Sequence, residues 1–313
     1  MMRQVFTDWQ PYHTELFGEH PVELGHNLAE GGLFSDETLA ELIERTPRED
    51  YHVSTMDPES HDPKSRREGV IDGLDGMQVL EAVRKGHIWL NLRNSAAYNP
   101  AYDDMLKSIY AELDERLGVK TFKHQMTILI SSPNVHVGYH CDVPGQTLWQ
   151  LRGTKRVYVY PNSAPFLPPA DLEKILLGEA HEVSLKFEPW YDDHARIIDL
   201  EPGRMLTWPH NAPHRVVNHD CLNVSLTTEH WTAPLRNAYG VNYANGLIRS
   251  WTGAKTLSQS TDSAAFYAKL SLAAADKLSG LRRARQHKFK IDFKVNPNAP
   301  LGYEDVPAYE FQK

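Results

Sequence analysis

Two histidines and one aspartate in the middle of the chain could bind Fe(II). His140 and Asp142 are separated by one residue, and His214 lies further along the chain. Alternate side chains of a strand share a face, so His140 and Asp142 are expected to point the same way. Two imidazoles and one carboxylate occupy one face of an octahedral Fe(II) ion and leave the other face open. A His and an Asp on a surface strand are the alternative interpretation of this spacing.

Three further features accompany this set of side chains. Lys155 lies within residues 150–161, which predict a strand beside the first two candidate ligands, and an inward lysine there could pair with a dicarboxylate. Residues 201–209 combine a Pro-Gly turn with a strand that ends shortly before His214, which itself begins another strand. An exposed lysine, a glycine turn and a core histidine are the ordinary explanations for the same three features.

The neighbours of the candidate ligands have less certain roles. His136 precedes His140 by four residues on the same predicted strand, so it shares that face and either lines the pocket or is a core histidine. His210 lies between two prolines that exclude a helix, which makes it a pocket residue or a plain loop histidine. Cys141 points to the opposite face from its neighbours, and we assign it to packing.

The segment that carries these residues is rich in short predicted strands. From Gln125 onward, β-type segments alternate with Gly and Pro, which is typical of an all-β sandwich or barrel. Residues 161–178 interrupt the series and contain a short predicted helix, which we interpret as an insertion. The predicted strands are 126–130, 135–142, 147–160 (a strand pair or a bent strand), 182–187, 197–200, 204–208, 214–218 and 222–228.

The flanking regions contain more helix. In residues 1–120, Ser35 is a predicted N-cap, and Phe34 can pack on Leu39 at the start of the helix. Residues 236–313 are predicted to be helical, most clearly at 263–281, where one face carries an apolar stripe. The chain is thus divided into 1–120, 121–235 and 236–313, which together form one compact unit. The members of the stripe are Phe266, Leu270, Ala274 and Leu278.

Composition excludes several classes of protein. Hydrophobic residues make up 41% of the 313 residues, enough for a sizeable core, and no long uncharged apolar stretch predicts a membrane span. Two cysteines are too few for a disulfide framework, so a reducing, cytoplasmic location is expected. The net charge of −8 disfavours nucleic-acid binding, and the one basic run, 282–288, is better explained as a solvated helix end.

At these residues the sequence resembles the Jumonji C and cupin-like (cupin 8) oxygenases, in the style of the asparaginyl hydroxylase that inhibits the hypoxia-inducible factor. The resemblance covers about residues 86–230. It rests on His140-x-Asp142, on Lys155 within a Gly-x-Lys-Arg string, and on Pro209 followed at the same spacing by His214.

The resemblance implies a mainly β fold with flanking helices, a double-stranded β-helix, and an Fe(II)- and 2-oxoglutarate-dependent oxygenase that consumes dioxygen. It implies iron on His140, Asp142 and His214, and Lys155 on the distal carboxylate of 2-oxoglutarate. It also places Trp89 and Asn91 on a strand facing the cosubstrate, with Ser225 beside it.

Two positions depart from the family pattern. The family has a Thr three residues before its first ligand, where this chain has Val137, and a Tyr on the upstream strand, where this chain has Trp89. Two hydroxyl donors to the cosubstrate are therefore missing. Thr127 or Tyr139 could replace them.

Other functions and partners stay open at this stage. One alternative is a metal-dependent cupin enzyme that does not use 2-oxoglutarate, and another is a Jumonji-like sensor that binds a small acid without turnover. The oxidised substrate is either a small molecule or a protein side chain. By resemblance the C-terminal stripe predicts a homodimer, although it could instead pack on the β core.

Overall fold

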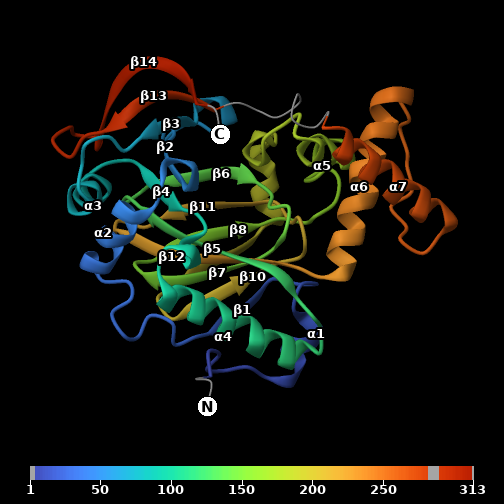
Figure 1. The fold of residues 1–313 in the computed structure, drawn as a ribbon, viewed down its shortest axis with the longest axis horizontal. Helices are drawn as coiled ribbons and strands as arrows, with labels where there is room; N and C mark the ends of the chain where they lie inside the picture. Colours follow the sequence, from blue (N-terminus) through green and yellow to red (C-terminus); the bar gives the residue numbers. More distant parts are fainter. Residues whose placement is uncertain (1–3, 281–288, 312–313) are drawn as a thin grey trace.

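Eight strands between residues 122 and 231 lie in two sheets, four strands in each, and pair antiparallel with one another (Figure 1). The computed structural model describes residues 4–280 and 289–311. Neighbouring strands run in the order β5-β12-β7-β10 in the large sheet and β6-β11-β8-β9 in the small sheet. This order is that of a double-stranded β-helix, so the predicted fold is confirmed. The strands are β5 (Phe122–Ser131), β6 (His136–His140), β7 (Gly145–Arg152), β8 (Lys155–Val159), β9 (Arg196–Leu200), β10 (Arg204–Thr207), β11 (His214–Asn218) and β12 (Asn223–Trp231).

The large sheet extends beyond the β-helix on both sides. Strands from the N-terminal region flank it, and a C-terminal hairpin completes it, with β13 parallel to β3. The sheet therefore takes strands from all three predicted regions, and the boundaries at 120 and 235 stay a prediction. The added strands are β1 (Val22–Gly25), β2 (Tyr51–Thr55), β3 (Arg67–Val70), β4 (Trp89–Leu92), β13 (Phe289–Val295) and β14 (Tyr303–Phe311).

The C-terminal hairpin differs from the helical region that we expected there. Ile291, Phe293 and Val295 alternate with polar residues and are almost fully buried, which is the pattern of a half-buried strand. The phenyl ring of Phe293 lies directly over the backbone of Gly69 on β3, where a side chain would collide with it. The hairpin therefore belongs to the main core.

Phe293 is expected to contribute substantially to stability. It is fully buried, so Phe293→Ala should lower the free energy of unfolding by about 3–5 kcal/mol. Tyr309→Ala, on β14 of the same hairpin, should change it by less than about 0.5 kcal/mol because Tyr309 is 48% exposed. Urea unfolding measures both. Equal small effects would show that the hairpin is not part of the core.

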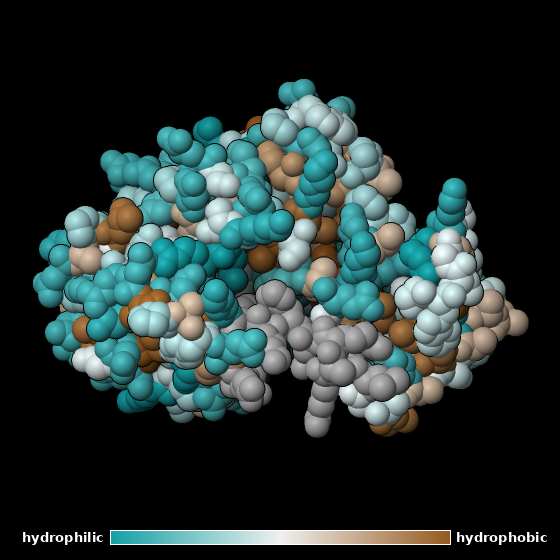
Figure 2. Space-filling model, turned by 90° about the horizontal axis from the view of Figure 1, so that it is seen from above, coloured by the Kyte–Doolittle hydropathy of each residue, from teal (hydrophilic) through white to brown (hydrophobic). Residues whose placement is uncertain are grey.

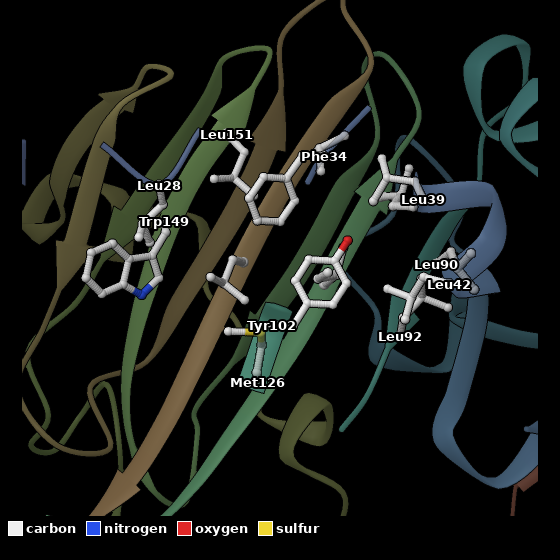
Figure 3. Close-up of a cluster of buried hydrophobic side chains, with 14 of the residues drawn as sticks. Leu28, Phe34, Leu39, Leu42, Leu90, Leu92, Tyr102, Met126, Trp149 and Leu151 are labelled. Atoms are coloured by element: carbon white, nitrogen blue, oxygen red, sulfur yellow. The ribbon is translucent and has the colours of Figure 1, made fainter. Parts of the chain in front are cut away.

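Three helices cover the outer face of the large sheet and form the main core with it (Figure 3). Tyr102 and Leu42 of these helices pack against sheet residues such as Trp149 and Met126. The predicted helix start is confirmed, because the Ser35 hydroxyl accepts a hydrogen bond from the Thr38 amide at 3.3 Å. The helices are α2 (Asp36–Arg45), α3 (Gly76–Lys85) and α4 (Pro100–Leu117), preceded by the short α1 (Pro11–Leu16).

Strand alternation leaves the opposite face of the large sheet more polar. On β5, Met126, Ile128 and Ile130 join the main core, so Thr127 and Leu129 face the small sheet. Between the two sheets, a separate apolar group fills the side of the β-helix formed by β7 to β10. Its buried members are Leu148, Val157, Val159, Ile198, Leu200, Leu206, Trp208 and Ala212. The remaining polar inner face can accommodate a site.

A second layer of helices packs beside the small sheet. Helices α5 (Pro169–Leu177), α6 (Ala233–Thr252) and α7 (Ala264–Ser279) share a hydrophobic group with the outer face of β6. Helices α6 and α7 form the right-hand side of the molecule, whose upper surface is largely hydrophilic, with hydrophobic residues in small separate groups (Figures 1 and 2). Within the described residues, no helix has the length and apolar character needed to cross a membrane.

The predicted apolar stripe on α7 is partly buried and partly exposed to solvent. Phe266 is buried, and Leu270 packs directly over Gly240 of α6. Leu278, in contrast, is 88% exposed. Part of the stripe thus packs on α6 rather than on the β core, and Leu281, the predicted end of this helix, lies outside the described residues together with the basic run 282–288.

The prediction of a strand at residues 182–187 is wrong. The chain there forms a 3-10 turn, Glu182–Ser184, and then a 3-10 helix, Pro189–His194. The His181 ring accepts a hydrogen bond from the Val183 amide. This local bond stabilises the turn and takes up an amide that a strand would need for pairing with a neighbouring strand. The other 3-10 helices are Arg48–Asp50, Pro63–Ser65 and Ser95–Ala97.

Candidate metal centre and adjoining pocket

The three candidate ligands meet at one end of the small sheet. His140 ends β6 and His214 begins β11, and these two residues pair directly in the antiparallel ladder. Their ring centroids are 4.1 Å apart, and His214 Nε2 lies 3.4 Å from Asp142 Oδ2. One donor atom from each of the three residues lies within 4.8 Å of the others. The sequence prediction that these side chains converge on one point agrees with this geometry.

Backbone carbonyls orient both imidazole rings. His140 Nδ1 lies 2.7 Å from the Gly138 carbonyl oxygen, and His214 Nδ1 lies 3.2 Å from the Ala212 carbonyl oxygen. A carbonyl only accepts, so Nδ1 carries the proton in each ring and Nε2 keeps a free lone pair. Both Nε2 atoms are therefore prepared to bind a cation.

Neighbouring side chains hold Asp142 in place. With its amide nitrogen turned toward the carboxylate, Gln146 on β7 donates to both Asp142 oxygens, at 2.9 Å to Oδ1. The Asn211 amide donates to the Asp142 carbonyl oxygen at 2.6 Å. His210 Nε2 lies 2.8 Å from the Val143 carbonyl oxygen, so His210 fixes the backbone next to Asp142 rather than entering the pocket. These contacts orient the ligand.

A β-bulge changes which residues of β6 face the large sheet. The register between β6 and β11 shifts between the His214–His140 pair and the Val216–Val137 pair. Val137 thus shares the inner face with His140, three residues away. His136 faces outward, and its Nε2 lies 3.1 Å from the Ser60 carbonyl oxygen. The expectation that His136 shares a face with the ligands is therefore wrong, because it assumed an uninterrupted period of two. The alternative that His136 is a core histidine agrees with its burial and this hydrogen bond.

Burial determines the protonation of the triad. It lowers the pKa of His140 and of His214 to about 4, and it raises the pKa of Asp142 to about 6. At neutral pH the site thus offers two neutral imidazoles and one carboxylate, the state that binds a divalent cation. A 2-His-1-carboxylate set with part of the coordination shell free fits non-haem Fe(II).

The affinity of this site for metal is expected to depend on pH through Asp142. The carboxylate must lose its proton to bind, so affinity should be nearly constant above about pH 6 and should fall by about tenfold per unit below it. Titration with redox-inactive Mn(II) at several pH values measures this. A midpoint near the ordinary aspartate pKa of 3.8 would contradict the effect of burial.

Lys155 lies at the other end of the same inner face. It begins β8, pairs with Asn218 in the ladder, and is only 4% exposed. Within the described part of the chain its ammonium group has neither a hydrogen-bond nor an ion-pair partner. Burial lowers the pKa of Lys155 to about 7, opposed only by nearby Cys221. Because an unpaired buried charge is costly, this position favours an anionic ligand.

The other predicted cosubstrate residues lie on the inner face of the large sheet, which faces the small sheet. Thr127 on β5 pairs with Thr227 on β12, and both are buried. The Ser225 hydroxyl donates to Gln150 Oε1 at 2.7 Å. Asn91 on β4 pairs with Leu129 of β5, which brings it to the same inner face. The large sheet thus contributes hydroxyl and amide groups between the metal centre and Lys155.

The two positions that depart from the family pattern contact one another. Trp89 forms a small apolar group with Met56 and Val135, and Val137 packs against it. A hydrophobic contact between Trp89 and Val137 thus replaces the two hydroxyl groups that the family has at these positions. Tyr139 cannot replace them, since it lies on the outer face and its hydroxyl donates to the Phe166 carbonyl oxygen at 2.8 Å. Cys141 is buried on that same outer face, as expected.

Sequence reasoning missed several polar residues that lie near the candidate ligands. Gln146 and Thr227 follow from strand alternation once the ladders are known. Glu229, two residues after Thr227 on the inner face of β12, could have been found by the same alternation. Glu182 could not, because its segment was predicted to be a strand.

Solved structures provide the comparison for this geometry. The chain is similar to an X-ray structure of E. coli YcfD, with a TM-score of 0.52 and 16% identity over 89% of this chain and 69% of the other. The fold is that of YcfD. A structure of this ribosomal oxygenase from Escherichia coli in complex with cobalt and 2-oxoglutarate matches with a TM-score of 0.51 and 16% identity, over 88% and 68% of the two chains.

Sequence comparisons add nothing further. No model of a protein family matches the chain, and no curated protein sequence matches it. At 16% identity the YcfD structures establish the fold alone. The function has to be argued from the site.

Proposed function

We propose that the chain is an Fe(II)- and 2-oxoglutarate-dependent oxygenase that couples decarboxylation of 2-oxoglutarate to succinate with oxidation of a C–H bond. The observation that carries the proposal is the buried, unpaired Lys155 on the same inner face of the small sheet as the triad of His140, Asp142 and His214. One end of this face suits a metal ion and the other an anion. A 2-oxo diacid can satisfy both ends.

The residues of the chain have distinct roles in this proposal. His140, Asp142 and His214 would hold Fe(II), and Lys155 would bind the distal carboxylate of 2-oxoglutarate. When bound, the iron supplies activation of dioxygen for oxidation of the substrate. The apolar group between the sheets keeps water away from this pocket. The charges of Fe(II) and Lys155 balance those of Asp142 and the two carboxylates of the cosubstrate.

The YcfD structure supports this assignment by its fold and by the metal and cosubstrate bound in it. The YcfD structure in complex with cobalt and 2-oxoglutarate shows that this fold holds a metal and this cosubstrate in that protein. The present chain supplies its own triad and lysine within the same arrangement of strands.

Anaerobic titration tests the proposal directly. Apo-protein is titrated with Fe(II) and then with 2-oxoglutarate, and chelation of the iron by the 2-oxo acid is expected to give a visible charge-transfer band. Admitting oxygen should then release succinate. Absence of the band contradicts the use of 2-oxoglutarate, whereas a band without succinate, with or without candidate substrates, indicates a sensor.

The contact of Trp89 with Val137 favours a second candidate, a metal-dependent cupin enzyme that does not use 2-oxoglutarate. This contact removes two hydroxyls that the family uses for the cosubstrate. Lys155 argues against this candidate, because a pocket without an acid leaves its charge unpaired. Metal binding without the charge-transfer band would support the second candidate.

The substrate, the oligomeric state and the cellular location are also part of the proposal. We infer that the substrate is a protein side chain or a small molecule and that the chain forms a homodimer through α7, where Tyr267 is 71% and Leu278 is 88% exposed. The mass in solution tests the dimer. Cys141 and Cys221 are both unpaired, which supports the expected cytoplasmic location.

A further inference from the structure

Two connections between the sheets lie against each other at the Lys155 end of the small sheet. One joins β7 to β8, and the other joins β11 to β12. Gly153 of the first connection lies so close to the Leu222 carbonyl oxygen of the second that a side chain there would collide with it. The His219 amide donates to the Thr154 carbonyl oxygen at 3.1 Å. The two connections therefore form one packed unit directly before Lys155.

The thiol of Cys221 lies between these two connections. Its Sγ accepts hydrogen bonds from the Thr154 amide at 3.3 Å and from the Asn223 side-chain amide at 3.7 Å. Asn223 is buried on the inner face of β12, where its Oδ1 accepts from the Gln150 amide at 2.7 Å. The sulfur thus lies at the end of the inner face, yet Cys221 is only partly buried. Donors around a partly exposed sulfur favour the thiolate, which is the reactive form of cysteine.

Lys155 gives an independent indication that an oxygen acceptor belongs beside this sulfur. It directly follows Thr154, whose amide and carbonyl groups lie 3.3 and 3.7 Å from Cys221 Sγ. Lys155 is 4% exposed, and within the described residues its ammonium group has no acceptor. Cys221 is also the group whose charge acts on this ammonium group. An oxygen atom attached to Cys221 would therefore meet a buried donor that lacks a partner.

We propose that Cys221 is an oxidation site and that its oxidised sulfur binds Lys155 in place of the distal carboxylate of 2-oxoglutarate. The competition with 2-oxoglutarate rests on the proposed oxygenase function. The two acceptors need the same ammonium group, so oxidation of Cys221 would switch off cosubstrate binding without a change at the metal triad.

The oxidant in this proposal is a hydroperoxide. The Cys221 sulfur attacks one peroxide oxygen, so an S–O bond forms while the O–O bond breaks. The other oxygen takes the thiol proton and leaves as water or an alcohol. The sulfur loses two electrons and the peroxide gains them. The product is a sulfenic acid, which is a reversible oxidation state of cysteine.

Cys141 provides an internal comparison. It is fully buried in the apolar group on the outer face of β6, away from Lys155. A structural cysteine buried in apolar surroundings is inert. Of the two cysteines, Cys221 alone is therefore expected to react in the folded protein.

Thiol reactivity tests the contact between Cys221 and Lys155 without metal or cosubstrate. Reduced apo-protein is treated with iodoacetamide or hydrogen peroxide, and mass spectrometry of its peptides locates the product. We expect modification at Cys221 and none at Cys141. Lys155→Met should slow the reaction with iodoacetamide by about fivefold or more, because the ammonium charge favours the thiolate. Lys64→Met, at an exposed lysine, should leave the rate unchanged, and equal rates in all three proteins would overturn the inference.

A charged substitution tests the competition with 2-oxoglutarate. Cys221→Asp places a permanent oxygen anion beside Lys155, and Cys221→Asn is the neutral variant of the same shape. Measured by the charge-transfer band, the Asp variant should bind 2-oxoglutarate about tenfold or more weakly than the Asn variant, with equal affinity for Mn(II). Apo-protein treated with peroxide should behave like the Asp variant until dithiothreitol restores it.

The two experiments separate the inference from the function on which it rests. Equal 2-oxoglutarate affinity of the Asp and Asn variants, together with unchanged affinity after peroxide treatment, overturns the competition. If the reduced, unsubstituted protein gives no charge-transfer band, the oxygenase function and the competition both fail. The effect of Lys155→Met on the reaction rate of Cys221 still decides whether Cys221 is an oxidation site coupled to Lys155.

Discussion

Asp142→Ala should eliminate succinate formation and reduce the affinity for Fe(II) or Mn(II) by more than the roughly 10- to 100-fold that is typical for loss of a group that only orients a ligand. Asp142 supplies the one carboxylate of the triad, and the remaining donors are two neutral imidazoles. His140→Ala should have the same effect. Metal titration and a succinate assay measure the two quantities.

The fold is expected to survive this substitution. The carboxylate of Asp142 is held in a buried site without a protein cation, so its removal relieves an electrostatic cost. Asp193→Ala, at an exposed aspartate, serves as the control and should leave both metal affinity and turnover unchanged. Succinate formation by Asp142→Ala at the rate of the control would refute the proposed centre.

Lys155→Met should weaken 2-oxoglutarate binding by about 2–4 kcal/mol, or roughly 30- to 1,000-fold, while metal affinity stays the same. The substitution removes the buried cation at the far end of the inner face and keeps most of the side-chain volume. The charge-transfer band at increasing 2-oxoglutarate concentration measures the dissociation constant. Lys64→Met, at an exposed lysine, is the matched control, and an equally small effect of both variants would exclude Lys155 from the cosubstrate site.

The same variant should change how stability depends on pH. The pKa of Lys155 is about 7 in the folded protein and 10.5 in the unfolded chain. Between these values the unfolded chain holds more protons, so the free energy of unfolding should rise with pH across this window. Below about pH 7 the full cost of the buried charge is present. Lys155→Met should therefore be more stable than the unsubstituted protein at pH 7 and should lack this rise.

The residue pattern contained most of the fold and the metal centre. Short β-type segments separated by Gly and Pro predicted an all-β sandwich or barrel, and the family resemblance implied that it is a double-stranded β-helix. Strand alternation predicted that His140 and Asp142 share a face. The convergence of the ligands could be predicted because it requires only that each ligand lies on the expected strand of the fold. Lys155 was found for the same reason.

The errors arose where tertiary structure overrides a local pattern. A bulge between Val137 and His140 turned His136 outward, and period-two reasoning from sequence cannot detect a bulge. Residues 182–187 alternate like a strand, but a local cap on His181 produces a turn instead. The strand at Phe289–Val295 was missed although it forms a local hairpin with β14. The sheet that buries its apolar face is reached through β3, which is more than two hundred residues away in the chain.

Under the proposed function, the ladder of the small sheet would set the length of the dicarboxylic acid that can bind between the triad and Lys155. Four residue steps along β11 separate His214, at one end, from Asn218, opposite Lys155, a span of about 13 Å at about 3.3 Å per step. An acid anchored at the triad must be long enough for its far carboxylate to meet the lysine. Oxaloacetate, one methylene shorter than 2-oxoglutarate, would leave a gap there. Strand register, rather than any single lining side chain, thus discriminates by chain length.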